Sequence, residues 1–153
     1  MKIVFASDHA GFALKNALVS YVRDELGYEV MDAGPENLDP MDDYPVFIKR
    51  ATKEVVDGEG EVRVIILGGS GQGEAMQANR FVGVRAAVFY GGAPDTALDI
   101  IRLSREHNDA NILSFGARFV SEEEAKDAVR LWLSTEKNPE EKYARRIRMM
   151  DEG

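Results

Sequence analysis

The chain alternates short runs of β-branched and apolar residues with longer segments in which apolar residues recur every three or four positions. This alternation is typical of a parallel β-sheet covered by helices, because each parallel strand needs a crossover connection to reach the next one. The run Val62–Leu67 is apolar at nearly every position, as expected for a central strand buried on both faces. The five predicted strands are Lys2–Ser7, Glu29–Ala33, Val62–Leu67, Val84–Tyr90 and Ala110–Ser114.

Segments of helical periodicity connect these strands. Leu14, Leu18 and Leu26 recur on one face of a first helix, which we expect to end at Gly27. Ser121 with Glu124 three residues later forms a capping box, which marks the start of another helix. The further predicted helices are Pro45–Val56, one starting at Ala75, Thr96–Glu106, Ser121–Leu133, and one from Pro139 toward Met150. The pattern predicts a single βαβ-type domain over residues 1–153 with an added C-terminal helix.

Composition excludes several classes of function. The 27 acidic residues outnumber the 19 basic ones, so general attraction to nucleic acid or to a membrane surface is not expected. The chain has no cysteine, which removes thiolate nucleophiles and cysteine-ligated metals and fits a reducing cytoplasm. The first apolar run ends at Ser7, too early for a secretory or membrane-spanning segment. We therefore expect a soluble cytoplasmic protein.

Four glycines occur within Gly68–Gly73, between the most apolar strand and a helix. In parallel α/β folds ligands bind at the carboxyl ends of strands, and closely spaced glycines let backbone N–H groups turn toward an oxyanion or phosphate. The spacing matches neither the dinucleotide fingerprint nor the nucleotide phosphate loop. A tight turn without a ligand is the alternative, although such a turn needs only one or two glycines.

The only two histidines lie in polar segments linked to strands. His9 follows the first strand next to Asp8, which either caps a helix or belongs to a site. His107 and Asn108 precede the last strand, and a solvated helix end explains them less well than it explains their neighbours. We expect the two histidines to share one acid/base site. Their spacing does not predict a metal site.

Three basic residues stand out in this acidic chain. Arg118 follows the last strand, whereas Lys142 and Arg146 lie four residues apart in the most basic run of the sequence. A solvated helix face is the ordinary reading of such a run. The alternative, which we favour, is a local cationic group suited to one phosphate.

Together these motifs resemble the type B ribose-5-phosphate isomerase family, which includes galactose- and allose-6-phosphate isomerases. The motifs that carry the resemblance are Ser7–Gly11, Asp43–Pro45, Gly68–Glu74, Ser104–Asn108 and Arg145–Ile147. The resemblance implies a Rossmann-like, three-layer α/β/α fold with a five-stranded parallel sheet and an extra C-terminal helix. It also implies a homodimer or dimer of dimers with active sites between subunits, a phosphorylated sugar as substrate, and no cofactor.

The missing cysteine points to the base. In many members of the family the base is a cysteine at the position of Gly68, whereas in a second branch a glutamate at the end of the loop takes that role. Glu74 occupies this place. Moving a carbonyl between C1 and C2 needs a base and a group that stabilises the enediolate. We expect Glu74 to be the base, held in its anionic form by the start of a helix.

The other residues of the expected site have distinct roles. Amides of Gly69–Gly73 and the Ser70 hydroxyl would bind the enediolate oxygens, with Ser70 relaying a proton between them. By resemblance, His107 opens the sugar ring, Asp8 and Asn108 hold sugar hydroxyls, and phosphate is bound by His9 with the three basic residues. The expected catalytic residues are Glu74, His107, Ser70 and Asp8, and the expected substrate-binding residues are His9, Tyr44, Gly69, Gly71, Gln72, Gly73, Asn108, Arg118, Lys142 and Arg146.

Departures from the family pattern keep alternatives open. Lys142 stands where relatives often have arginine, and Tyr143 where some have histidine, so the phosphate would meet a point charge there. The connection Tyr90–Asp95 is longer than expected for ribose enzymes, and we expect it to border the pocket. The predicted reaction interconverts ribose 5-phosphate and ribulose 5-phosphate; the alternatives are a tetrose- or hexose-phosphate isomerase, or a non-catalytic phosphate-binding regulatory module.

Overall fold

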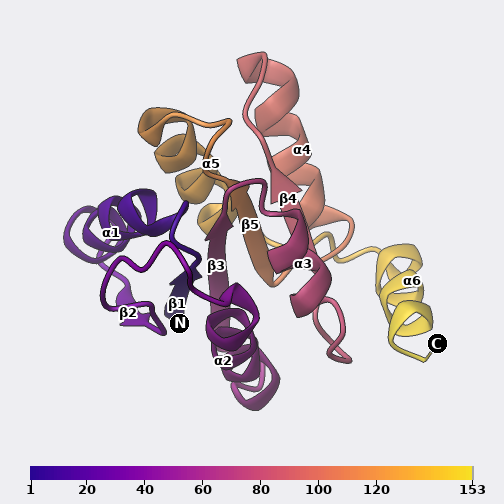
Figure 1. Cartoon of the computed structure of the whole chain (residues 1–153). Helices are drawn as coiled ribbons and strands as arrows, with labels where there is room; N and C mark the ends of the chain where they lie inside the picture. The colour runs from indigo at the N-terminus through magenta and orange to yellow at the C-terminus, as the bar shows by residue number, and fades with distance from the viewer. Residues whose placement is uncertain (153) are drawn as a thin grey trace.

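A five-stranded parallel sheet in the order β2-β1-β3-β5-β4 organises the chain (Figure 1). The structure is a computed structural model that describes residues 1–152. β3 lies in the centre and is buried along its whole length, as its apolar sequence predicts. The strands are β1 (Lys2–Ser7), β2 (Glu29–Asp32), β3 (Val62–Gly68), β4 (Ala86–Phe89) and β5 (Ile112–Gly116).

The predicted helices are present, and the first of them changes form along its length. α1 continues into the π-helical turn η1, in which the Leu26 N–H donates to the Tyr21 carbonyl five residues back. The capping box of α5 is confirmed, because the Ser121 hydroxyl accepts from the Glu124 N–H at 3.2 Å. The helices are α1 (Phe12–Ser20), η1 (Tyr21–Glu25), α2 (Tyr44–Asp57), α3 (Gln72–Ala78), α4 (Pro94–Glu106), α5 (Glu122–Ser134) and α6 (Glu141–Asp151).

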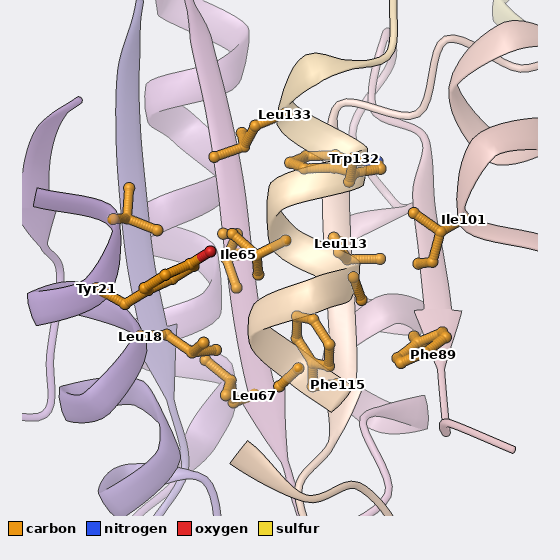
Figure 2. Packing of buried hydrophobic residues seen from close by; sticks show 14 of the residues in the cluster. Leu18, Tyr21, Ile65, Leu67, Phe89, Ile101, Leu113, Phe115, Trp132 and Leu133 are labelled. Atoms are coloured by element: carbon orange, nitrogen blue, oxygen red, sulfur yellow. The ribbon is translucent and has the colours of Figure 1, made fainter. Parts of the chain in front are cut away.

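Helices cover both faces of the sheet and bury two apolar clusters. On one face, Trp132 of α5 and Tyr21 of η1 pack toward the central strands (Figure 2). On the other face, α2 and α3 contribute Ile48 and Ala78 to a second cluster against β1 and β3. Burying both faces of a parallel sheet supplies the main favourable free energy of such a fold. The three-layer α/β/α, Rossmann-like architecture is confirmed.

The structure corrects the predicted ends of two strands. β4 is shorter than the predicted Val84–Tyr90, and β5 lies two residues later than the predicted Ala110–Ser114. Ala110 lies after the end of α4 and is still bonded to it, because its N–H donates to the Ser104 carbonyl at 3.0 Å. At the other end of β5, Gly116 pairs with Gly68. Because pairing with a neighbouring strand stabilises both glycines, they join the sheet despite their low strand propensity.

α6 stands apart from the two helical layers, and its contacts are with the segment before β4 and with the residues after α4 (Figure 1). Its Tyr143 ring stacks on His107, with the ring centroids 4.5 Å apart. Near its other end, Asp151 accepts a hydrogen bond from the Gly83 N–H at 3.3 Å. No described residue of α6 is buried, so this helix leaves most of its surface uncovered in the single chain. Among residues 1–152, no helix has the length and apolar character needed to span a membrane.

Candidate active site

Asp8 joins the end of β1 to the glycine loop. One of its carboxylate oxygens accepts from the Gly11 N–H at 2.7 Å, and the other accepts from the Gly69 N–H at 3.3 Å. The first bond closes a turn just before α1, whose N-cap residue is Gly11, and the second links Asp8 to the glycine loop. The role of Asp8 in a site stays a prediction. In this state the Gly69 amide, an expected enediolate donor, is already bonded to Asp8.

The glycine loop folds tightly against β5. Gly71 has φ +72°, and a Cβ atom there would lie 2.8 Å from the Phe115 carbonyl, so only glycine fits. The Ser114 hydroxyl donates to the Gly71 carbonyl at 2.7 Å and fixes the turn from behind. Within the loop, the Gln72 N–H donates to the Ser70 hydroxyl oxygen at 3.3 Å. The chain then enters α3, three residues earlier than the predicted start at Ala75.

The carboxylate of Glu74 lies directly over the Cα atom of Gly68. Glu74 is only 4% exposed, and a Cβ atom on Gly68 would lie 2.1 Å from both its Cδ and its Oε1. A side chain at position 68 and the carboxylate of Glu74 therefore compete for the same space. Tyr44, at the start of α2, approaches the same loop, since a Cβ atom on Gly73 would lie 2.5 Å from its hydroxyl oxygen.

Burial raises the pKa of the Glu74 carboxyl; its own backbone N–H opposes the rise, and the carboxylates of Asp8 and Asp42 add to it. Desolvation therefore outweighs the favourable field of the short helix α3, and the expectation that Glu74 is anionic at neutral pH stays a prediction. A carboxylate whose pKa is raised is a stronger base than one in water, provided that it is ionised at the working pH.

His9 and Arg118 are the cationic groups near Glu74. His9 Nδ1 lies 2.9 Å from Asp42 Oδ1; this hydrogen bond raises the pKa of His9, while burial opposes the rise. Arg118 packs on the glycine loop, since a Cβ atom on Gly69 would lie 3.4 Å from its Cζ. Within the described chain, the Arg118 side chain forms no ion pair and no hydrogen bond. A guanidinium without an ion-pair partner, beside an imidazole whose pKa is raised by its bond to Asp42, suits a phosphate.

The connection between β4 and α4 contacts the glycine loop. The Gln72 side-chain amide donates to the Tyr90 hydroxyl oxygen at 2.5 Å. The Tyr90 ring lies close to Gly116, where a Cβ atom would be 2.6 Å away, and meets the Phe119 ring edge-on at 5.5 Å. These contacts put Tyr90 beside Gln72, in line with the expectation that this connection borders the pocket.

His107 and Asn108 lie at the amino ends of the strands, whereas Glu74 and the glycine loop lie at the carboxyl ends. They follow α4, which starts after the carboxyl end of β4 and returns to the amino ends of the strands. Here the Asn111 N–H donates to the Arg85 carbonyl, just before β4. Strands of this length separate the two edges by roughly 15 Å. Within one chain, His9 and His107 therefore do not share an acid/base site, and that prediction is wrong for the single chain.

The three basic residues of the predicted phosphate site are likewise divided between the two ends of the strands. Arg118 lies near Glu74, whereas Lys142 and Arg146 lie on α6 at the edge that carries His107. Lys142 forms an ion pair with Glu140 at 2.8 Å, and its ammonium lies 4.7 Å from the centre of the Tyr143 ring. The connection from α5 into α6 runs past the amino ends of the strands. Within one chain, Lys142 and Arg146 therefore do not approach Arg118.

A cavity of about 640 Å³ opens beside this second group of residues. Asn108 and Ser104 line it on the α4 side, and Met150 lines it on the α6 side. No residue of the glycine loop takes part in its lining. The single chain thus presents two separate half-sites: the Glu74 half-site, with Asp8, His9, Tyr44, Gly69–Glu74 and Arg118, and the His107 half-site, with Asn108, Lys142 and Arg146.

Sequence reasoning missed Asp42 as a member of the Glu74 half-site. Asp42 lies in a loop rich in proline and acidic residues, 33 residues from His9, and nothing local indicates that the two side chains pair. The buried Lys15 was also missed; its ammonium bonds the Asp32 carboxylate at 2.6 Å and the Pro35 carbonyl at 2.8 Å. Within residues 1–152, no three His, Asp or Glu side chains form a group suited to a metal ion.

Comparisons with known proteins agree on one family. The family model described as Ribose/Galactose Isomerase matches residues 3–150. Ribose-5-phosphate isomerase B of Escherichia coli (strain K12) is 39% identical over 135 residues, which cover 88% of this chain and 85% of that protein.

Solved structures resemble the chain over nearly its whole length. Ribose-5-phosphate isomerase B of Clostridium thermocellum is 38% identical, with a TM-score of 0.89, and the match covers 99% of this chain and 96% of that one. The Mycoplasma genitalium enzyme with bound ribulose-5-phosphate is 30% identical, with a TM-score of 0.89, and the match covers 99% of this chain and 94% of that one.

Proposed function

Because this chain belongs to the ribose/galactose isomerase family, we propose that it interconverts ribose 5-phosphate and ribulose 5-phosphate through an enediolate. Similar proteins carry the name ribose-5-phosphate isomerase B, and one similar structure holds ribulose-5-phosphate. The observation that carries the proposal is the buried carboxylate of Glu74, which lies over Gly68 at the head of the glycine loop. A base in this position can reach a sugar bound across the loop.

Glu74 moves the proton in this reaction. It removes the proton from C2 of the open-chain aldose, and the electron pair of that bond forms the C1–C2 double bond while O1 accepts a proton. Return of the proton from Glu74 to C1, with loss of the proton on O2, gives the ketose. The raised pKa of Glu74 makes its carboxylate a better proton acceptor in the first step, and the same carboxyl returns the proton in the second step.

The glycine loop stabilises the enediolate. Backbone N–H groups of Gly69–Gly73 and the Ser70 hydroxyl lie where negative charge develops, and Ser70 relays the proton between O1 and O2. Forming this complex requires Gly69 to exchange its bond to Asp8 for one to the substrate, which frees the Asp8 carboxylate to hold a sugar hydroxyl. Arg118 and His9 bind the phosphate at the outer end of the same half-site.

We propose further that a complete site forms between two copies of the chain, as a homodimer or dimer of dimers. The Glu74 half-site of one copy would meet the His107 half-site of the other, since about 15 Å of sheet separates the two within one copy. His107 of the second copy would open the furanose ring, Asn108 would hold a hydroxyl, and Lys142 with Arg146 would complete the phosphate site. The exposed Val82, Met149 and Met150 are available to be covered in such an assembly.

Mixing two inactive variants tests this shared site. Glu74→Gln and His107→Asn should each abolish turnover, whereas subunit exchange between them should restore about a quarter of wild-type activity in a random dimer mixture. The recovery arises because one of the two sites in a mixed dimer receives both intact half-sites. Native mass spectrometry monitors the exchange. Complete exchange without recovered activity would show that each chain supplies its own full site.

Hydrogen exchange from solvent tests the reaction itself. With ribose 5-phosphate in D₂O and no added metal or cofactor, we expect deuterium at C2 of the remaining aldose and at C1 of the ketose, detected by NMR. A panel containing tetrose and hexose phosphates separates the alternatives. Faster exchange with a hexose phosphate would favour that substrate, and it would implicate the Tyr90 connection beside Gln72 in specificity. No exchange with any sugar would favour a binding module.

We propose that the whole chain, residues 1–153, acts as one isomerase domain in the cytoplasm. The described strands all belong to one sheet, the helices α1–α5 cover its two faces, and α6 packs beside them. The lack of cysteine suits a reducing compartment.

A further inference from the structure

We propose that Asp42 is a positioning residue, which fixes the imidazole of His9 and keeps it positively charged for the phosphate of the substrate. This inference rests on the proposed function, in which His9 binds the phosphate. Asp42 lies in the loop between β2 and α2, outside the expected site. Its role follows from three observations: its bond to His9, its burial, and the way the structure holds its loop.

The hydrogen bond between Asp42 and His9 determines which ring nitrogen faces the ligand. Asp42 Oδ1 lies 2.9 Å from His9 Nδ1, so Nδ1 carries a proton toward the carboxylate. The other ring nitrogen, Nε2, is then left for the ligand, and the His9 side chain retains 36% exposure. When the ring is protonated, its Nε2–H can donate to a phosphate oxygen.

The burial of Asp42 favours the charged form of His9. The Asp42 side chain is 4% exposed, and among residues 1–152 its second oxygen has no hydrogen-bond partner. A carboxylate so far removed from water needs a positive partner, and His9 is the cation at hydrogen-bond distance. Deprotonation of His9 would leave Asp42 as an uncompensated buried charge.

Groups from two other parts of the fold act on His9 as well. Asp8, at the end of β1, also favours the protonated ring, whereas Arg118, after β5, disfavours it. In the proposed dimer, Lys142 and Arg146 of the second copy would add positive charge near the phosphate and would oppose protonation further. Asp42 is therefore the group that keeps His9 positively charged although other cations lie near the same phosphate site.

The loop that carries Asp42 is anchored to the core. The fully buried ammonium of Lys15 donates to the Pro35 carbonyl at 2.8 Å, and the Arg50 guanidinium donates to the Ala33 carbonyl at 3.1 Å. Nearer to Asp42, its own N–H donates to the Asp39 carbonyl at 3.1 Å. These bonds hold the Asp42 carboxylate at a fixed place, as a positioning role requires.

Asp42→Asn tests the proposal, because the amide oxygen can still accept from Nδ1 while the charge is lost. His9 and His107 are the only histidines, so NMR of the free enzyme follows both rings, with His9→Gln providing the assignment. In Asp42→Asn we expect the midpoint of the His9 titration curve to move to lower pH, whereas the midpoint of the His107 curve should not change. Glu36→Gln, which removes an exposed charge from the same loop, is the matched control and should move neither midpoint.

Kinetics of the same variants distinguish positioning from general damage. At pH 7.5 we expect Asp42→Asn to raise KM for the sugar phosphate by roughly tenfold, with kcat within about twofold of the wild-type value. In the wild type KM should increase as the pH rises and His9 loses its proton, and in Asp42→Asn this increase should begin at a lower pH. In the His9→Gln background, Asp42→Asn should have no further effect on KM. Inorganic phosphate, followed through the His9 resonances, measures anion binding without turnover.

An unchanged His9 midpoint in Asp42→Asn would overturn the proposal, and so would a loss confined to kcat. The histidine titration needs no substrate, so it stands even if the proposed reaction is wrong. Conversely, a shifted midpoint without any effect of phosphate on His9 would preserve the ion pair but refute its role in phosphate binding. Unchanged thermal unfolding and backbone spectra of each variant confirm that it is folded.

Discussion

Glu74→Gln is expected to lower kcat by roughly 10³-fold while the protein stays folded. The amide has nearly the same shape as the carboxyl, so it retains the packing over Gly68, but it cannot accept the C2 proton. Because burial raises the pKa of Glu74, the free energy of unfolding at neutral pH should stay the same or increase when that charge is removed. Steady-state kinetics with ribose 5-phosphate and thermal unfolding measure the two effects.

A matched substitution controls for the loss of negative charge. Glu123→Gln removes an exposed carboxylate from the first turn of α5, outside both half-sites, and should leave kcat unchanged. Full turnover by Glu74→Gln would remove Glu74 from the mechanism. Loss of activity accompanied by a lower unfolding temperature would instead assign Glu74 a structural role.

Gly68→Ala is expected to lower kcat by roughly 10²-fold through displacement of the base. The new methyl group would lie 2.1 Å from the Glu74 Cδ and 2.3 Å from its Oε2, far inside any tolerated contact. The atoms it meets belong to the end of a side chain with rotatable bonds, so Glu74 can swing away and the strand stays in place. A crystal structure of the variant and its kcat test this effect.

The double variant separates displacement from other damage. If Gly68→Ala acts through Glu74, adding it to Glu74→Gln should lower kcat little further, because the base is already absent. Independent, multiplicative losses would contradict that route. The contact gives a reason for Gly68 and Glu74 to occur together: a side chain at position 68 would take the space of the Glu74 carboxylate, so glycine there makes room for our candidate base.

Local sequence was sufficient for most of the fold. The apolar run Val62–Leu67 indicated the central strand, because only a strand covered on both faces tolerates so few polar residues. Ser121 and Glu124 marked the start of α5 to the residue, since both partners of a capping box lie within one turn. The prediction for β5 was displaced, because Gly116 joins the sheet by pairing with Gly68, and a glycine carries no local preference for a strand.

The candidate site residues also divide into those that local sequence indicates and those that only the packing of distant elements brings together. Glu74 could be proposed from the sequence because a glycine loop, a helix start and a missing cysteine lie together or can be counted directly. The edge on which His107 lies could have been inferred from the helix that precedes it, since a crossover helix returns to the amino ends of parallel strands. The prediction of a shared site rested instead on the position of both histidines in turns next to predicted strands.

By itself the sequence determined a parallel sheet with two helical layers, a glycine loop after its central strand, and Glu74, our candidate base, in the first turn of the helix that follows. Those features depend on periodicity and on residues a few positions apart. Only the tertiary structure placed Glu74 over Gly68, paired Asp42 with His9 across 33 residues, and set His107 at the far edge of the sheet. Such contacts depend on how distant elements pack, and side chains far apart in sequence carry no local mark of their partners.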